Sequence, residues 1–454
     1  MQPFDTLPLD RKLIEHLHSV GFSHATPVQS ETIPYIIEGK DLIARAETGS
    51  GKTMAFALPI VQKCDTTQPL AQALIIAPTR ELADQIADTI RTLCAYRPNL
   101  KVTTLYGGVP LRTQTDALKQ GTHILVATPG RTLDHLGKGT LNLSSIKQFV
   151  LDEADKMLQM GFIDDILSIA AHLPSSRQSL LFSATFSPKI EALAQSILKN
   201  PVHIDSDTLH SLSTIEERVC TVTNKYKTLE TLIGAYRPRS LLLFINTKTE
   251  VSNLYRRLIS KGHDVVALHG DLDQDKRDEA LIRFRNGSCR IMVATDIASR
   301  GLDIDGVDMV VNYDLPFDES TYIHRIGRTG RSGMKGLAVS FHTAGSIKTA
   351  YVFHRASELK VSSLSFIDGA PLKARYDTIR IGGGKKSKLR KGDIVGTLCK
   401  EVGLFQNQIG TITILSDRSY VAIETGVSVQ TYAKLKLTKI KKRKYLVSLL
   451  KNEA

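Results

Sequence analysis

The sequence predicts an α/β protein in which two domains with parallel sheets are followed by a small α+β domain. Short, continuous apolar runs such as "ALIIAP" and "HILVATP" recur through residues 40–360, and helical patterns separate them. Strands buried on both faces show such continuous runs, because helices cover both sides of a parallel sheet. The length of 454 residues leaves room for about three domains.

The apolar runs fall into two series. The first consists of "DLIARA", "ALIIAP", "VTTLYG", "HILVATP", "FVLDEA" and "SLLFSAT", and the second of "RVCTV", "SLLLFIN", "DVVALHG", "RIMVATD", "DMVVNYD" and "GLAVSFH". Between them, "DSDTLHSLSTIEE" is polar and lacks strong periodicity, as a linker does. We therefore expect one domain over residues 1–207 and a second over residues 214–375.

The rest of the chain predicts a joint and a third domain. The stretch "IGGGKKSKLRKGD", residues 381–393, combines three glycines with a basic run and indicates a flexible basic linker over residues 376–387. Strands are expected at "DIVGTLC", "GTITIL", "SYVAIE" and "KYLVSLL". A short helix near residues 404–409 and a longer one over "VSVQTYAKLKL" complete a βαββαβ order for residues 388–454.

The basic charge is concentrated at the C-terminal end. The net charge is +13, and residues 385–454 hold 15 Lys and Arg against 5 Asp and Glu, a net of +10 that leaves +3 for the rest. Such asymmetry favours a tail that binds an anion, most often a nucleic acid.

The cysteine and apolar patterns exclude other classes. The five cysteines have neither paired nor ligand-like spacing, so we expect reduced thiols and no zinc site. The N-terminal "MQPFDTLPLD" lacks the apolar core of a signal peptide. No apolar run approaches the roughly 18 residues of a membrane span. We expect a cytoplasmic protein that does not bind a membrane.

The segment "AETGSGKT", residues 46–53, predicts a phosphate-binding loop after the first strand. Its glycines let backbone N–H groups surround phosphate oxygens at the start of a helix. Lys52 would reach the β- and γ-phosphates, and the Thr53 hydroxyl would bind Mg²⁺. The pattern G-x-x-x-x-G-K-[ST] fails only at Ala46, and a purely structural turn is the alternative.

Three carboxylates end the apolar run of "FVLDEADKM", residues 149–157. In open parallel sheets, ligands bind beyond the carboxyl ends of strands. Asp152 could therefore support Mg²⁺, often through water, and Glu153 could orient or deprotonate an attacking water. A helix that merely begins with acidic residues is the alternative reading.

These residues belong to an ordered set of motifs that resembles the DEAD-box RNA helicases. The tetrad of residues 152–155 spells the family's name. The other matching motifs are "GFSHATPVQ", "PTRELADQ", "TPGR", "SAT", "FINTK", "ATDIASRGLDI" and "HRIGRTGR", in the family's order across about residues 1–360. The resemblance implies two RecA-like domains in tandem, with ATP and Mg²⁺ as cofactors and RNA as the partner.

The resemblance also implies roles for residues of the nucleotide site. Gln29 would pair with adenine, because an amide both donates and accepts, and Phe4 would stack on the base. Arg328 and Arg331 resemble arginine fingers, whose guanidinium forks suit phosphate oxygens. The nucleotide-binding set is Phe4, Thr26, Gln29, Ala46, Glu47, Thr48, Gly49, Ser50, Gly51, Lys52, Thr53, Asp303, Arg328 and Arg331. The catalytic set is Lys52, Asp152, Glu153, Arg328 and Arg331.

RNA contacts and coupling residues follow from the same motifs. Hydroxyls, backbone N–H groups and arginines contact phosphates and sugars without reading bases, so the two domains should bind RNA without sequence preference. The implied contacts are Pro78, Thr79, Arg80, Gly108, Thr128 and Arg131, then Asn246, Thr247, Gly270, Thr295 and Arg300. Asp155, Ser183, Thr185 and His324 would couple the sites, with Ser183 and Thr185 bonding back to the acids.

The C-terminal sequence resembles the RNA-binding domain of the DbpA group of bacterial helicases, an RRM-like domain. In that group the domain recognises a hairpin of 23S ribosomal RNA during assembly of the large subunit. Only Tyr420 offers an aromatic residue at the expected stacking segment, so basic edges are the more natural contacts. These are Lys388, Arg390, Lys391, Lys442, Arg443 and Lys444; a merely solubilising tail is the alternative.

Three functions remain open from the sequence. The first is an ATP-dependent RNA helicase that unwinds short duplexes and is directed to 23S ribosomal RNA, acting as a monomer. The second is an ATP-gated RNA clamp or a general RNA remodeller without ribosomal specificity. The third, a binding protein with a relic nucleotide site, is disfavoured by the intact Lys52, Glu153, Arg328 and Arg331.

Overall fold

The computed structural model describes residues 2–46, 49–205, 214–296, 304, 306–330, 335–343, 352, 355–364 and 369–451. These residues form two compact units, of which the first ends at residue 205 and the second begins at residue 214. The predicted division between two α/β domains therefore falls between the two units.

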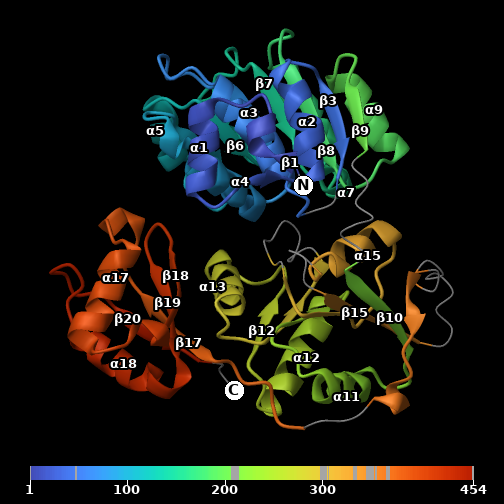
Figure 1. The fold of residues 1–454 in the computed structure, drawn as a ribbon, viewed down its shortest axis with the longest axis vertical. Coiled ribbons are helices and arrows are strands. Elements are labelled where there is room, and N and C mark those ends of the chain that lie inside the picture. Colours follow the sequence, from blue (N-terminus) through green and yellow to red (C-terminus); the bar gives the residue numbers. More distant parts are fainter. Residues whose placement is uncertain are drawn as a thin grey trace. The chain divides into compact units, whose positions relative to one another are not determined.

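The first domain is built on a parallel sheet whose described strands follow the order β5-β6-β4-β7-β8-β3-β9 (Figure 1). The strands are β3 (Leu42–Arg45), β4 (Ala73–Ile76), β5 (Val102–Leu105), β6 (Ile124–Ala127), β7 (Gln148–Leu151), β8 (Gln178–Ser183) and β9 (Val202–Asp205). Every apolar run of the first series is a strand, so this part of the prediction is confirmed. The edge strand β9 was not expected, because its residues alternate between half-buried and exposed.

Helices cover both faces of this sheet. They are α1 (Arg11–Ser19), α2 (Pro27–Ile37), α3 (Lys52–Lys63), α4 (Arg80–Leu93), α5 (Leu111–Lys119), α6 (Pro129–Gly137), α7 (Ala154–Gln159), α8 (Ile163–Ala171) and α9 (Pro188–Ile197). Leu42 and Ala44 of β3 pack with α1–α4, whereas Ile43 packs with α7–α9. Successive strand residues thus serve two cores, which explains the continuous apolar runs.

The second domain repeats this architecture with the strand order β12-β13-β11-β14-β15-β10-β16 among its described residues. The strands are β10 (Ile215–Thr221), β11 (Leu241–Phe244), β12 (Val265–Leu268), β13 (Ile291–Ala294), β14 (Met309–Asn312), β15 (Gly336–His342) and β16 (Ser357–Glu358). The helices are α11 (Lys225–Tyr236), α12 (Lys248–Ser260), α13 (Gln274–Arg285) and α15 (Glu319–Ile326). The six predicted runs of the second series are again strands.

The C-terminal domain has the predicted βαββαβ order, but its first two elements were misplaced. It consists of β17 (Tyr376–Ile381), α17 (Lys391–Thr397), β18 (Ile409–Ile414), β19 (Ser419–Glu424), α18 (Thr425–Leu437) and β20 (Val447–Leu450). The antiparallel sheet follows the order β18-β19-β17-β20. A flexible linker over residues 376–387 is therefore wrong, because β17 is an inner strand and residues 385–387 form a short 3₁₀ helix.

The segment "DIVGTLC" is helical rather than extended. Ile394, Leu398 and Val402 are buried at a spacing of four residues, which matches one face of a helix. The Asp393 carboxylate accepts a hydrogen bond from the Arg390 N–H at 2.9 Å and caps the first turn. The expected helix near residues 404–409 is reduced to a 3₁₀ turn at Gln406–Gln408.

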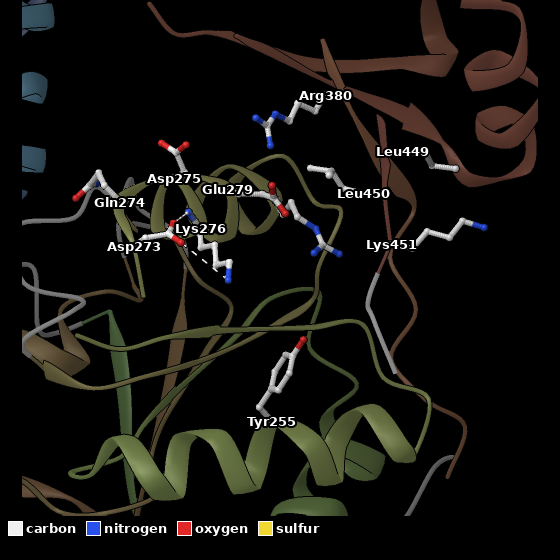
Figure 2. Close-up of a pocket in the computed structure, with 11 residues that line it drawn as sticks. Tyr255, Asp273, Gln274, Asp275, Lys276, Glu279, Arg380, Leu449, Leu450 and Lys451 are labelled. Atoms are coloured by element: carbon white, nitrogen blue, oxygen red, sulfur yellow. Dashed lines mark hydrogen bonds and ion pairs between the residues drawn. The ribbon is translucent and has the colours of Figure 1, made fainter. Parts of the chain in front are cut away.

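Within the second unit, the C-terminal sheet packs on the second domain next to α13. The Thr378 hydroxyl of β17 accepts a hydrogen bond from Asn286 Nδ2 at 2.9 Å and donates to Ser288 Oγ at 2.8 Å. A cleft of about 870 Å³ opens along this contact, between side chains of α13 and those of β17 and β20 (Figure 2). Its lining mixes acidic and basic side chains, so no single charge marks it for a ligand.

We expect Thr378→Val to weaken this contact. The substitution keeps the shape but leaves two buried polar groups, on Asn286 and Ser288, without a partner, which costs about 1–3 kcal/mol. The measurement is the urea midpoint of the full chain, with the exposed Thr411→Val of β18 as a matched control. Equal midpoints for the two variants would show that the hydroxyl does not hold the domains together.

Candidate functional site

The strand order divides the carboxyl edge of the first sheet into two halves. The adjacent strands β7, β8 and β3 lead into the acidic tetrad, the "SAT" segment and the glycine-rich loop. The adjacent strands β5, β6 and β4 lead into Gly108, Thr128 and Thr79, on the other half. Ligands of parallel sheets bind at this edge. One domain thus presents two neighbouring sites, one for a nucleotide and one for the implied RNA contacts.

The glycine-rich loop has the backbone that a phosphate loop needs. Gly49 and Gly51 have φ values of 87° and 97°, which only glycine adopts without strain. Lys52 begins α3 and is 6% exposed, and its Nζ donates to the Ala46 carbonyl at 2.7 Å. The lysine is therefore held over the loop by a neutral acceptor that a phosphate oxygen can replace. Ser50 and Thr53 lie in the same turn, while Glu47 and Thr48 lie outside the described residues.

Gln29 connects the N-terminal motif to this loop. Its Oε1 accepts from the Thr26 N–H at 3.0 Å, and its Nε2 donates to the Gly51 carbonyl at 3.0 Å. A Cβ at position 51 would lie 2.4 Å from Gln29 Nε2, so the contact requires glycine there. The Gln29 amide, which is predicted to pair with adenine, thus also connects α2 to the glycine-rich loop. Adenine would have to replace these bonds.

Phe4 does not offer a face for stacking. The ring is fully buried among the core residues of the first domain, and its N–H donates to the Ser23 carbonyl at 3.2 Å. The expectation that Phe4 stacks on the base is not supported by this position. Burial of a large aromatic ring in the core explains the residue without a ligand.

The three carboxylates after β7 are all buried. Asp152, Glu153 and Asp155 are each 2% exposed, and the Glu153 N–H donates to Asp152 Oδ1 at 3.0 Å. Burial raises the pKa of Asp152 to about 6, and the nearby Glu153 adds to the rise while the charge of Lys52 opposes it. Buried anions of this kind need cations nearby, and Mg²⁺ is the kind of ion that such oxygens bind.

Glu153 is held in an unusual conformation. It has φ 55° and ψ 51°, a left-handed conformation that turns the end of β7 into α7. Lys156 Nζ donates to Glu153 Oε2 at 2.8 Å, and both side chains are 3% exposed. Non-glycine residues in this region cluster at functional sites. Lys156 was not predicted from the sequence, although its place three residues after Glu153, on the same face of a helix, indicates such a contact.

The "SAT" segment contacts the acids through one residue only. The Thr185 hydroxyl donates to Asp155 Oδ2 at 3.4 Å, whereas the Ser183 hydroxyl donates to the Thr185 carbonyl at 2.7 Å. The expectation that both side chains bond to the acids is therefore wrong for Ser183. Its hydroxyl instead shapes the turn that brings Thr185 to Asp155.

The other half of the edge presents the first-domain residues implied in RNA binding. Thr79 caps the N-terminus of α4, since its hydroxyl accepts from the Leu82 N–H at 3.3 Å, and Thr128 directly precedes α6. Helix N-termini favour phosphate oxygens. The Arg80 guanidinium lies over the Tyr106 ring, 5.0 Å from its centre. Pro78 lies two residues after the end of β4, and Gly108 has a φ of 80°.

The second domain has a similar row of residues implied in RNA binding. Asn246 and Thr247 follow β11, Gly270 follows β12 and Thr295 follows β13, and these three strands are neighbours in the sheet. Asn246 is not a free amide, because Oδ1 accepts from Arg325 Nη2 at 2.9 Å and Nδ2 donates to the Leu315 carbonyl at 3.1 Å. Its side chain therefore shapes the loop.

Arg325 and Arg328, which follow β14, have different surroundings. Arg325 is fully buried and donates two hydrogen bonds of 2.6 Å to the Asp296 carboxylate, a structural role that was not predicted from the sequence. Arg328 follows α15 and is 5% exposed, and its Nε donates to the His324 carbonyl at 3.3 Å. Arg300, Asp303 and Arg331 lie outside the described residues.

The basic residues of the C-terminal domain form one surface from two distant segments. Lys388, Arg390, Lys391, Lys442, Arg443 and Lys444 are all exposed. Lys441 Nζ donates to the Lys388 carbonyl at 3.1 Å, which brings residues 388–391 next to residues 441–444. Tyr420 is fully buried, so it cannot stack on a base. The structure therefore favours the basic surface over the sheet for anion binding.

Two features are absent from the described residues. None of their helices is long and apolar enough to cross a membrane. No group of three or more His, Cys, Asp or Glu among them has an arrangement that could hold a metal ion.

Comparisons with known proteins agree with the domain order. Residues 26–193 match the DEAD/DEAH box helicase family, residues 224–333 the helicase conserved C-terminal domain, and residues 378–449 the DbpA RNA binding domain. The ATP-dependent RNA helicase DbpA of Escherichia coli strain K12 is 41% identical over 459 residues, which cover 99% of this chain and 100% of that protein. DbpA of Bacillus subtilis strain 168 is 36% identical over 477 residues, with 99% of each chain covered.

Solved structures agree as well. S. cerevisiae Dbp5 bound to RNA and ADP BeF3 is 31% identical, with a TM-score of 0.71 over 80% of this chain and 96% of that one. Agreement through both sheet domains defines the class, a DEAD-box RNA helicase that uses ATP. Because the match continues through the C-terminal domain, the chain belongs to the DbpA family of these helicases.

Proposed function

We propose that the enzyme hydrolyses ATP with groups from both sheet domains and that its C-terminal domain directs it to a hairpin of 23S ribosomal RNA. It would act as a monomer in the cytoplasm, during assembly of the large ribosomal subunit. The observation that carries the proposal is the arrangement of the motifs along the two sheets. In each sheet three adjacent strands lead to motifs implied in RNA binding, and in the first sheet the adjacent β7, β8 and β3 lead to the acids and the glycine-rich loop.

At the nucleotide site, Lys52 binds the phosphates and Glu153 accepts a proton from the attacking water. Thr53 and Asp152 fit Mg²⁺, directly or through water, because a hydroxyl and a buried carboxylate are hard oxygen donors. The ion, when bound, neutralises phosphate charge. Arg328 and Arg331 contact the γ-phosphate from the second domain, and Asp303 binds the ribose. Hydrolysis therefore depends on the two domains closing on one nucleotide.

RNA is held by backbone contacts on both domains, so the two domains alone do not select a sequence. Closure on RNA bends one strand and separates a few base pairs, with Asp155, Thr185 and His324 linking the sites. Selectivity comes from the basic surface of the C-terminal domain. A tethered domain raises the local concentration of the helicase at one target.

A comparison of RNAs tests the targeting. We expect the ATPase of the full chain to be stimulated at lower concentrations by a 23S ribosomal RNA fragment than by unrelated RNA of equal length. Replacing Arg390, Lys442 and Arg443 by Ala should remove most of this difference, because phosphate contacts dominate affinity. Replacing the exposed Lys434, Lys436 and Lys439 is the charge-matched control. An equal loss of this preference in both variants would indicate that the basic residues of the C-terminal domain only increase solubility.

An unwinding assay separates the helicase from the clamp. With ATP and a short duplex attached to the ribosomal fragment, we expect strand release to accompany ATP turnover. Prolonged retention of intact duplex would favour the clamp.

A further inference from the structure

Gln114 is an unusual residue for its helix. It is 4% exposed, and it is the one buried residue of α5 within the part of the chain described. A helix that covers a sheet usually buries apolar side chains, and glutamine is seldom buried without a reason. We therefore attribute the burial of Gln114 to the hydrogen bonds that its amide forms.

Those bonds connect three elements. Nε2 donates to the Tyr106 carbonyl, just after β5, at 2.9 Å. Oε1 accepts from Arg131 Nη1 at 2.7 Å and from His135 Nε2 at 3.1 Å, both on α6. Burial lowers the pKa of His135, and its Nδ1 lies 2.8 Å from the Thr140 hydroxyl. Because Gln114 Oε1 can only accept, the hydrogen of that bond is on His135 Nε2.

The partners of Gln114 are the groups that hold the proposed RNA contacts. Arg131 Nη1 also donates to the Val109 carbonyl at 2.8 Å, so the loop of residues 106–109 and Arg131 are bonded to each other as well. The Tyr106 ring supports the Arg80 guanidinium, and a Cβ at position 108 would lie 3.0 Å from Arg80 Nη1. The loop of residues 106–109, Arg80 and Arg131 are therefore held in place by one connected set of contacts around Gln114.

We propose that Gln114 is a positioning residue for RNA, which fixes the loop of residues 106–109 and the Arg131 guanidinium so that both contact phosphates of one strand. The proposal rests on the RNA contacts of the proposed function. Gln114 does not touch RNA itself. Because Gln114 already orders Arg131 and the loop, less conformational entropy is lost when RNA binds.

The test is Gln114→Leu in the full chain, which keeps the volume but removes both the donor and the acceptor. We expect the RNA concentration that half-saturates the ATPase to rise about tenfold, as for loss of a hydrogen bond to a charged group. The kcat at saturating RNA and the affinity for fluorescent ADP should change less than about twofold. Gln120→Leu, at the exposed end of the same helix, is the matched control.

Gln114→Glu provides a second variant. It keeps an oxygen for Arg131 and His135 but loses the donor to Tyr106, so we expect an intermediate half-saturation. Half-saturation equal to that of Gln120→Leu in both Gln114 variants would overturn the proposal. So would a parallel loss of ADP affinity and melting temperature, which would mark a merely structural residue. If the unchanged chain is not stimulated by RNA, the proposed function itself fails.

Discussion

Glu153→Gln is expected to bind ATP but to lose about 10²–10⁴ of its turnover, the range of general base catalysis. The amide has the size of the carboxylate but cannot accept the proton of the attacking water. We expect binding to be retained because the proposed phosphate contacts, from Lys52 and the glycine-rich loop, do not involve Glu153. The measurements are steady-state ATPase at saturating RNA and titration with a fluorescent ATP analogue.

The ion pair with Lys156 makes a control necessary. Both side chains are 3% exposed, so the variant removes a carboxylate charge beside a buried ammonium, although the amide oxygen still accepts its hydrogen bond. We therefore expect a lower melting temperature as well as lost turnover. Glu191→Gln, on the exposed face of α9, controls for the change of charge. Turnover near that of Glu191→Gln would contradict the assignment of Glu153 as the base.

Twelve strands of the two parallel sheets could be predicted because each of these carries an apolar run, as in "ALIIAP" of β4. Their order in the sheet could not, since it depends on which helices cross which face. It is this order that places Thr79, Gly108 and Thr128 on neighbouring strands. The motifs thus predicted the contact residues, while their grouping required the fold.

The errors in the C-terminal domain have a common cause. Ile379 and Ile381 of β17 face the core, whereas Thr378 and Arg380, which alternate with them, face the second domain. The sequence of β17 therefore lacks the apolar pattern of a buried strand. The three glycines that follow it are typical of a flexible linker. A buried polar face against another domain has no signature in the sequence. The same holds for Gln114, whose partner Arg131 lies 17 residues away.

Removal of the C-terminal domain is expected to have the second large effect, the complete loss of preference for ribosomal RNA. A chain ending at Arg375 keeps both sheet domains and loses the basic surface formed by residues 388–391 and 441–444. Because its remaining RNA contacts are to the backbone, its ATPase should respond equally to ribosomal and unrelated RNA. Dbp5, which covers 80% of this chain, shows that two such domains fold without this module.

The point of truncation decides whether this experiment can be interpreted. A chain ending at Gly384 would keep β17 without β19 and β20, so Ile379 and Ile381 would lose their cover and promote aggregation. Ending at Arg375 instead exposes Asn286 and Ser288, polar groups that water can satisfy. We expect the shorter chain to remain monomeric in size-exclusion chromatography. A preference for ribosomal RNA that survives in it would place selectivity in the two sheet domains and remove the role given to the basic surface.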